Sequence, residues 1–276
     1  GITDVAGPGM PNYLNSPVVS PNGLAAYIPS KQDNILSGAL RGGAGMNFDQ
    51  TVRAVTSIVN LQDNTENPGA RIQHDNAGLA TGAAFSGTGQ YLYVALETSR
   101  EVAIYDTQGI FEVTRVNVGM APQGVATSID GTKLYVYSFM SRSVEQFDLS
   151  QLLYAGSSSI PLVSSGSTVS AEALSPTVKQ GKQLFYDAAD DRLALDNYMS
   201  CGSCHNEVAD DGRVWDLTGM GEGLRNTISL LGKGQGNGLI HWSGNFDEVQ
   251  DFELQIRSLA GGTGLMSDVD FALTED

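Results

Sequence analysis

A repeated phrase in the first half of the chain is the feature that most restricts its fold. The segment from Gly82 to Ala95 is echoed by the segment from Gly124 to Tyr137, which begins 42 residues later. Each copy predicts a strand, a tight turn at a glycine and a second strand, and a third strand follows at 101–106 and at 143–148. Self-similarity with a period of about 40 residues is typical of the four-stranded blades of a β-propeller. The sequence therefore predicts propeller blades in this half.

An earlier copy of the phrase runs from Val18 to Pro29, and its turn glycine lies 66 residues before that of the next copy. The surplus length lies in the stretches 37–47 and 63–69, which we interpret as surface loops. Three blades are too few to close a propeller, which takes about four to eight. We expect the remaining blades upstream of Gly1 or in another chain. An open β-meander or a sandwich is the alternative, because repeated strands with glycine turns occur there too.

A stretch rich in serine and glycine, residues 155–170, predicts a connector between two domains. The propeller blades are expected in residues 1–154, and the pattern turns helical in residues 171–276. Ser175 and Pro176 form a typical helix start, and a second helix is predicted at about 245–259. We therefore predict a multidomain β and α protein, in which a partial β-propeller of about three blades precedes a small all-α domain.

The charge of the chain limits its partners. The sequence has 31 acidic and 15 basic residues, a net charge of −16, of which −11 falls in residues 171–276. Such a surface repels nucleic acid and anionic membranes, so we expect neither as a partner and favour a protein with a basic face. No apolar run is long enough to span a membrane. Because the chain begins with Gly1 and not with Met, we expect it to be processed or part of a longer polypeptide.

The motif Cys201-Gly202-Ser203-Cys204-His205 carries the chemistry, and it uses both cysteines of the chain. This spacing lets two thiols add to the two vinyl groups of one haem, with His205 as the axial imidazole. A redox dithiol would need a βαβ context and would not need His205, and a zinc site would need four ligands from two cysteines and three histidines. We expect one covalent haem c. Since this attachment takes place outside the cytoplasmic membrane, we expect a periplasmic or extracellular protein.

The sixth ligand of the iron has several candidates. His241 lies beside a glycine-rich segment that allows a close approach to a haem face, and imidazole is a strong axial ligand. Met266, which follows another glycine-rich segment, would give a thioether and a higher potential, and Met220 is the third candidate. An open site or a ligand from a partner is the remaining alternative. The third histidine, His74, is expected in a surface loop.

Other side chains are candidates for haem contacts. Arg225 and Arg213 would pair with propionates, because a guanidinium binds a carboxylate through two parallel hydrogen bonds. Solvated surface arginines are the alternative interpretation. Trp215 and Trp242 would flank the macrocycle or belong to the core.

The surroundings of the motif resemble the haem domains of bacterial di-haem cytochrome c peroxidases and of their relatives that mature methylamine dehydrogenase. The resemblance spans residues 175–260 and rests on four segments, 181–185, 200–205, 223–230 and 241–244. The chain departs from the family at Ile228, where the family has proline. It also has one haem motif instead of two, and no methionine in the helix predicted near its end. A complete two-haem peroxidase cannot be assembled from this chain alone. The repeats are similar to bacterial seven-bladed propellers with Ser-Pro-Asp-Gly turns.

These expectations combine into a c-type cytochrome that carries electrons, in which the propeller serves as a docking or assembly platform. One alternative is a peroxidase-like enzyme with an open sixth site. The other is a haem-bearing subunit of a larger assembly or fibre.

Overall fold

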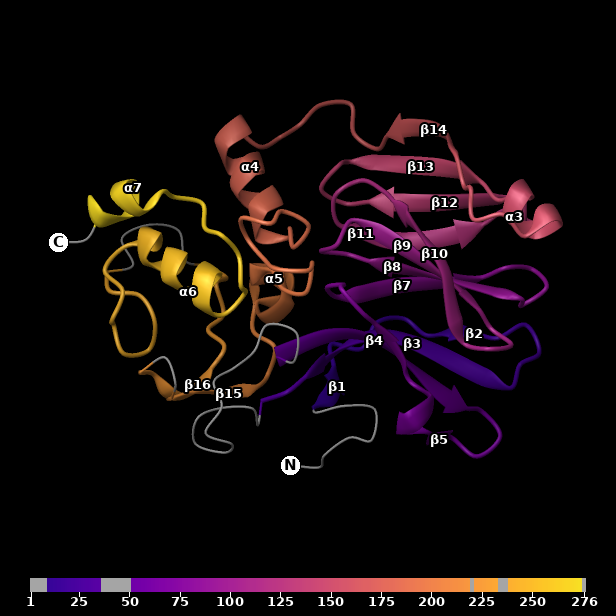
Figure 1. Cartoon of the computed structure of the whole chain (residues 1–276), viewed down its shortest axis with the longest axis horizontal. Coiled ribbons are helices and arrows are strands. Elements are labelled where there is room, and N and C mark those ends of the chain that lie inside the picture. Colours follow the sequence, from indigo (N-terminus) through magenta and orange to yellow (C-terminus); the bar gives the residue numbers. More distant parts are fainter. Residues whose placement is uncertain (1–8, 36–50, 219–220, 233–237, 275–276) are drawn as a thin grey trace.

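A computed structural model describes residues 9–35, 51–218, 221–232 and 238–274 (Figure 1). Three antiparallel sheets occupy the part that precedes residue 168. The predicted loop at 37–47 lies outside the described residues. The strands of the first sheet are β1 (Met10–Asn12), β2 (Val18–Val19), β3 (Ala25–Asp33), β4 (Val52–Asn60), β5 (Thr65–Glu66) and β6 (Ile72–His74). The second sheet has β7 (Ala80–Phe85), β8 (Tyr91–Leu96), β9 (Glu101–Asp106) and β10 (Phe111–Asn117), and the third has β11 (Pro122–Thr127), β12 (Lys133–Ser138), β13 (Ser143–Asp148) and β14 (Leu162–Ser167).

Each sheet is a meander, as a propeller blade is. The second and third sheets follow the chain in order, and in the first sheet the long pair β3–β4 is flanked by the short strands β1 and β2 on one side and β5 and β6 on the other. The repeated phrase makes the same turn in all three copies: the amide of the turn glycine donates to a serine carbonyl three residues earlier, at 2.8 to 2.9 Å. These glycines have φ of +72° to +76°, which a residue with a Cβ rarely adopts.

The sheets pack face to face, and the middle one is covered on both sides. All six residues of β8 are buried. One face of the sheet forms a core with Tyr27 and Ala54 of the first sheet, and the other a core with Leu134 and Val136 of the third. Strands β7 and β11 lie side by side, because the Thr81 hydroxyl donates to a carbonyl of β11 at 2.9 Å. The structure thus confirms the predicted partial propeller.

The outer face of the third sheet is only partly covered. Tyr137 and Val144 are 37% and 38% exposed there, whereas the equivalent Ala95 and Val102 of the second sheet are fully buried. Strand β14 is exposed along its whole length. Closure of the ring by further blades or by another chain stays a prediction.

Two details of the β half differ from prediction. Strand β14 lies within the serine- and glycine-rich stretch 155–170 and pairs with β13, so this stretch supplies the outer strand of the third sheet. His74 is not in a surface loop: it ends β6 and is fully buried. Its ring nitrogens lie 2.9 Å from the hydroxyls of Thr56 and Tyr105. A three-residue strand is too short for its alternation to be recognised in the sequence.

The C-terminal region contains both helices and a hairpin, so the prediction of an all-α domain is wrong. Its helices are α4 (Pro176–Phe185), α5 (Cys201–Cys204), α6 (Phe252–Ser258) and α7 (Asp268–Ala272), with short 3₁₀ turns η2 (Asn206–Val208) and η4 (Val249–Asp251). Strands β15 (Val214–Leu217) and β16 (Gly223–Asn226) pair antiparallel. Ser175 caps α4 as predicted, its hydroxyl accepting from Val178 N at 3.4 Å. The second helix starts later than predicted, because Asp251 accepts hydrogen bonds from the amides of Asp247 and Glu248 and fixes a turn there.

This region packs against one end of the sheets, beside the connections β8–β9 and β12–β13 and against strands β3 and β4 of the first sheet (Figure 1). Ala188 N donates to Thr98 O at 2.8 Å, and Arg100 forms an ion pair with Asp187. Tyr186 packs against Ala121 and Met140 of the propeller part. The C-terminal region and the blades therefore share an interface. In the ranges described, no helix combines the length and the apolar character needed to cross a bilayer.

Candidate functional site

The helix α5 presents the two cysteines of the motif on a single turn. Residues three apart in a helix lie on the same face, so the thiols of Cys201 and Cys204 point to one side. The turn is closed by a capping box, in which Ser200 N donates to the Ser203 hydroxyl at 3.0 Å. Both thiols are free, Cys201 being exposed and Cys204 half-buried. This arrangement lets both thiols reach one and the same group.

His205 leaves the helix and is oriented by a backbone carbonyl. Its φ and ψ of −90° and +62° end the turn, and its Nδ1 lies 2.9 Å from the carbonyl oxygen of Ile228. Since a carbonyl only accepts, Nδ1 carries the proton and Nε2 keeps its lone pair, which is the tautomer of a metal-ligating histidine. Burial lowers the pKa of His205, which favours the neutral form that ligation needs.

The surroundings of Cys204 differ from those of a redox dithiol. Cys204 packs in an apolar cluster with Met199, Trp215 and, from β4, Val52. Burial raises the pKa of the Cys204 thiol to about 12, and the charge of Lys31 offsets only part of the effect. Catalytic dithiols have thiol pKa values below the ordinary one. Within the described part of the chain, no group of three or more His, Cys, Asp and Glu side chains gathers in a way that could hold a metal ion.

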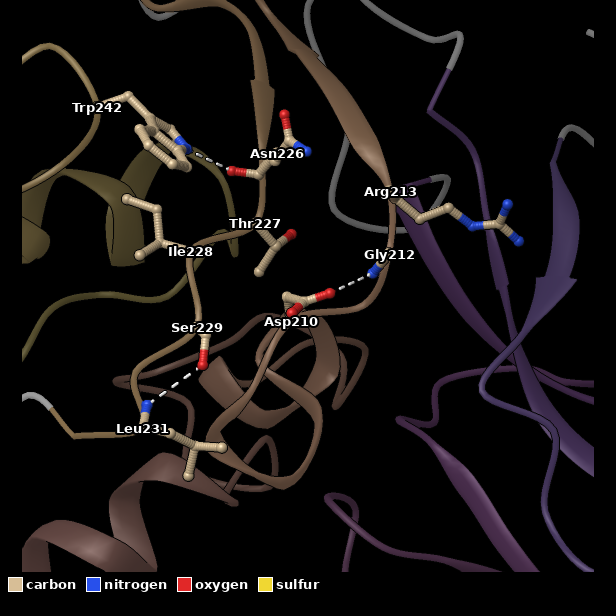
Figure 2. Close-up of a pocket in the computed structure, with 9 residues that line it drawn as sticks. All are labelled: Asp210, Gly212, Arg213, Asn226, Thr227, Ile228, Ser229, Leu231 and Trp242. Atoms are coloured by element: carbon tan, nitrogen blue, oxygen red, sulfur yellow. Dashed lines mark hydrogen bonds between the residues drawn. The ribbon is translucent and has the colours of Figure 1, made fainter.

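A cavity of about 450 Å³ adjoins the residue that orients His205. It is lined by Asp210, Gly212, Arg213, Asn226, Thr227, Ile228, Ser229, Leu231 and Trp242 (Figure 2). The Trp242 indole donates to Asn226 O at 2.8 Å and is held over the cavity although it is 61% exposed. Leu231 is 62% exposed. Trp242 and Leu231 are thus the exposed apolar side chains of a lining that is otherwise mostly polar.

The two arginines predicted as propionate partners have protein partners in this structure. Arg225, on β16, donates to the buried carboxylate of Glu222 at 3.1 Å. Arg213 extends from the cavity wall toward the first sheet (Figure 2), where it donates to Pro11 O at 3.2 Å and lies 3.6 Å from Asp33. Arg225 stays a candidate for a haem contact. Arg213 joins the C-terminal region to the blades.

His241 is held by four side chains. Its Nδ1 lies 3.0 Å from Asn245 Oδ1, and its Nε2 lies 3.2 Å from Gln255 Nε2. The ring packs between Phe246 and Phe252, with centroid distances of 4.1 and 5.2 Å. The Gln255 amide can only donate, so His241 Nε2 accepts. Ligation of iron by this nitrogen would require Gln255 to withdraw.

Met266 is fixed through its main chain. Its amide donates to the buried Glu253 carboxylate at 3.2 Å, and its carbonyl accepts from Arg257 at 2.7 Å. The side chain is half-buried. Met220 lies outside the described residues. The sixth-ligand predictions for His241 and Met266 therefore remain predictions.

Sequence reasoning missed a buried ion cluster behind the motif. Lys31 Nζ, on β3, lies 3.1 Å from Asp33 Oδ1 and 3.3 Å from Asp211 Oδ2. Asp211 also accepts from the Trp215 indole at 2.9 Å, so this tryptophan belongs to the core, as one of the two interpretations had it. Lys31 and Asp211 are 180 residues apart in the sequence. Nothing in either local pattern could have indicated the pairing.

Comparison with known proteins finds no matching family, and the similar structures named here are distant from this chain. No protein-family profile matches the chain, and no curated protein matches it. A structure of hydrazine synthase from Kuenenia stuttgartiensis is similar over 51% of this chain and 46% of its own, at 18% identity and a TM-score of 0.44. The WD40 repeats of RRP9 cover 56% of this chain and 38% of their own, at 16% identity and a TM-score of 0.39. The β-propeller domain of Cps50 (Swd1) from Myceliophteria thermophila covers 55% and 58%, at 14% identity and a TM-score of 0.36. The match thus covers between 38% and 58% of the length of these structures, and the propeller-like arrangement rests on the strand order and packing described above.

Proposed function

We propose that this chain is a periplasmic or extracellular c-type cytochrome that carries electrons through one covalently bound haem c. Cys201 and Cys204 would hold the porphyrin through thioethers, and His205 Nε2 would be the axial ligand. When bound, the haem supplies exchange of single electrons through its iron. Arg225 is the candidate for contact with a propionate.

The observation that carries the proposal is the hydrogen bond of His205 Nδ1 to the Ile228 carbonyl. A histidine that follows two thiols on one helical turn and is oriented through its second nitrogen has the features of a haem ligand. The adjoining cavity of about 450 Å³ is within the size range of ligand sites. Its exposed Leu231 and Trp242 would be shielded from water by a bound apolar ring.

The acidic surface is the basis for the proposed partner. With a net charge of −16, the chain would attract a redox protein that has a basic face, and added salt would weaken this attraction. The partner proposal is thus tested by the salt dependence of electron exchange with a basic protein.

The test of the haem proposal is a pyridine haemochrome spectrum together with the intact mass of the protein secreted by a host that attaches haem c. We expect one haem per chain, retained after acid–acetone extraction. The variant Cys201→Ala/Cys204→Ala should lose the covalent haem, and Ser164→Ala, on the exposed strand β14, should retain it. A wild-type mass equal to that of the bare polypeptide would overturn the proposal.

A second candidate is a peroxidase-like enzyme with an open sixth coordination site. The observation that favours it is that both ring nitrogens of His241 already have hydrogen-bond partners, Asn245 and Gln255. A high-spin ferric spectrum with rapid cyanide binding would support the enzyme. A low-spin spectrum that turns high-spin in His241→Ala or in Met266→Ala would support the electron carrier and assign the ligand.

A further inference from the structure

The buried ion cluster behind the haem motif joins the first blade to the C-terminal region. Lys31 and Asp33 are fully buried, and the carboxylate of Asp33 also accepts from the Asn12 amide at 2.7 Å. Asp211 closes the cluster from the segment that follows the motif, and Arg213 approaches Asp33 at its edge. Lys31, Asp33 and Asp211 thus meet in a region from which water is excluded, and the partly exposed Arg213 lies at its edge.

Trp215 connects this cluster to the haem attachment site. Its indole nitrogen donates to Asp211, and the ammonium of Lys31 lies 5.9 Å from the centroid of its ring. The same tryptophan packs in the apolar cluster that contains Cys204. The charges of Lys31 and Asp211 therefore lie close behind one of the two attachment points.

Lys31 keeps its positive charge in the folded protein. Burial lowers the pKa of Lys31, but the neighbouring Asp33, Cys204 and Asp211 more than offset this effect and raise the pKa above its ordinary value. A charge acts over a longer distance in a protein interior, where the effective dielectric constant is about 20, than in water, where it is about 80. A nearby positive charge favours the reduced form of a haem, and a negative charge favours the oxidised form.

We propose that Lys31 and Asp211 are positioning residues that tune the reduction potential of the haem in opposite directions, Lys31 raising it and Asp211 lowering it. The inference rests on the proposed function and deepens it: the first blade would be part of the redox site and not only a platform. Arg213, half-exposed at the edge of the cluster, would act in the same direction as Lys31 but more weakly.

The experiment is a spectroelectrochemical titration of the full-length holoprotein. We expect Lys31→Met to shift the midpoint potential downward and Asp211→Asn to shift it upward, while the double variant returns toward the wild-type value. Lys133→Met is the matched control, because Lys133 pairs with Asp148 on the partly covered face of the third sheet, 3.9 Å away. It should leave the potential unchanged.

The direction of the shift in midpoint potential is the decisive readout. If Lys31 and Asp211 only stabilised the fold, the two single variants would not shift the potential in opposite directions. Shifts of the same sign, or no shift in variants that retain one haem and the wild-type spectrum, would overturn the inference. If Lys31→Met fails to fold, Arg213→Gln and Asp211→Asn supply the opposed pair on their own. Absence of covalent haem in the wild type, measured first, would instead be a failure of the proposed function.

Discussion

The imidazole of His205 and the carbonyl of Ile228 come from segments 23 residues apart, and their hydrogen bond fixes which nitrogen of the histidine is free. The surroundings of buried titratable side chains elsewhere in the protein also determine their protonation. His74 and Glu97, both in the propeller part, have strongly shifted pKa values, that of His74 being lowered and that of Glu97 raised. Each shift gives a prediction at the scale of a single residue.

His74 should destabilise the protein in acid. Burial lowers its pKa from 6.5 to about 3. Between these values only the unfolded chain binds the proton, so the free energy of unfolding should fall as the pH drops from about 6.5 toward 3. In His74→Gln we expect less of this fall, and a loss of about 1–3 kcal/mol at pH 7 because Thr56 and Tyr105 lose a buried partner. Urea unfolding at pH 7 and pH 4.5 measures both effects. Tyr105→Phe should keep the wild-type pH dependence, and an equal acid loss in His74→Gln would contradict the prediction.

Glu97 should destabilise the protein at alkaline pH. It is 3% exposed, and burial raises its pKa from 4.5 to about 8. The unfolded chain releases this proton above about pH 4.5 and the folded chain only near 8, so the free energy of unfolding should fall as the pH rises through this window. Glu97→Gln removes that fall, and relative to wild type it should gain about 2 kcal/mol or more between pH 5 and pH 9. The exposed Asp196→Asn is the control. Parallel pH profiles of Glu97→Gln and wild type would exclude the assignment.

At the scale of elements, the turn that carries the cysteines packs closely against the end of α4. A Cβ on Gly202 would lie 3.1 Å from the Tyr186 ring, at the point where α5 meets the aromatic end of α4. A Cβ on Gly181, within α4, would meet nothing within 4 Å. A larger residue is therefore expected to clash at Gly202 and to be accommodated at Gly181, and substitutions can test this difference.

Gly202→Val should lower the free energy of unfolding by about 1–3 kcal/mol through overpacking against Tyr186. Gly181→Ala, the matched control, should raise it by about 0.5–1 kcal/mol, because alanine loses less backbone freedom in a helix than glycine. Chemical unfolding followed by circular dichroism measures both. Equal effects of the two substitutions would show that the contact with Tyr186 is not tight.

Strands with several alternating apolar and polar residues, and helices with a strong N-cap, could be predicted from the sequence. The repeats located β8 and β12, and the Ser175 cap located the start of α4. The hairpin β15–β16 was missed, because strands of four residues are too short for a periodic signal. At the site, the motif predicted Cys201 and Cys204 as attachment points and His205 as the axial ligand, and these roles stay predictions. It could not indicate the Ile228 carbonyl, which any residue would provide, nor the pairing of distant charges around Lys31.

At the scale of the whole molecule, the serine- and glycine-rich stretch does not separate independent parts. The contacts between them include the pair of Arg100 with Asp187 and the packing of Cys204 and Trp215 against Val52. Removing the blades would expose these apolar surfaces and leave Asp211 without Lys31.

Residues 171–276 expressed alone should therefore lack cooperative unfolding and bind less haem than the full chain. Denaturation followed by tryptophan fluorescence, with haem content per chain, measures this. As a control, the full chain with a protease site between residues 168 and 174 should retain its unfolding midpoint before cleavage. A fragment that unfolds cooperatively with full haem content would mean that the interface is dispensable.

The C-terminal region packs against one end of the blades, and this placement determines where the chain can accept insertions. In a meander, alternate turns lie at opposite ends, so the glycine turns at Gly89 and Gly131 lie at the far end of the sheets from the connections that contact Tyr186 and Ala188. Insertions at those turns would leave the contacts between the C-terminal region and the blades undisturbed. They are the positions at which a new recognition loop could be grafted, or a linker attached, away from the candidate site.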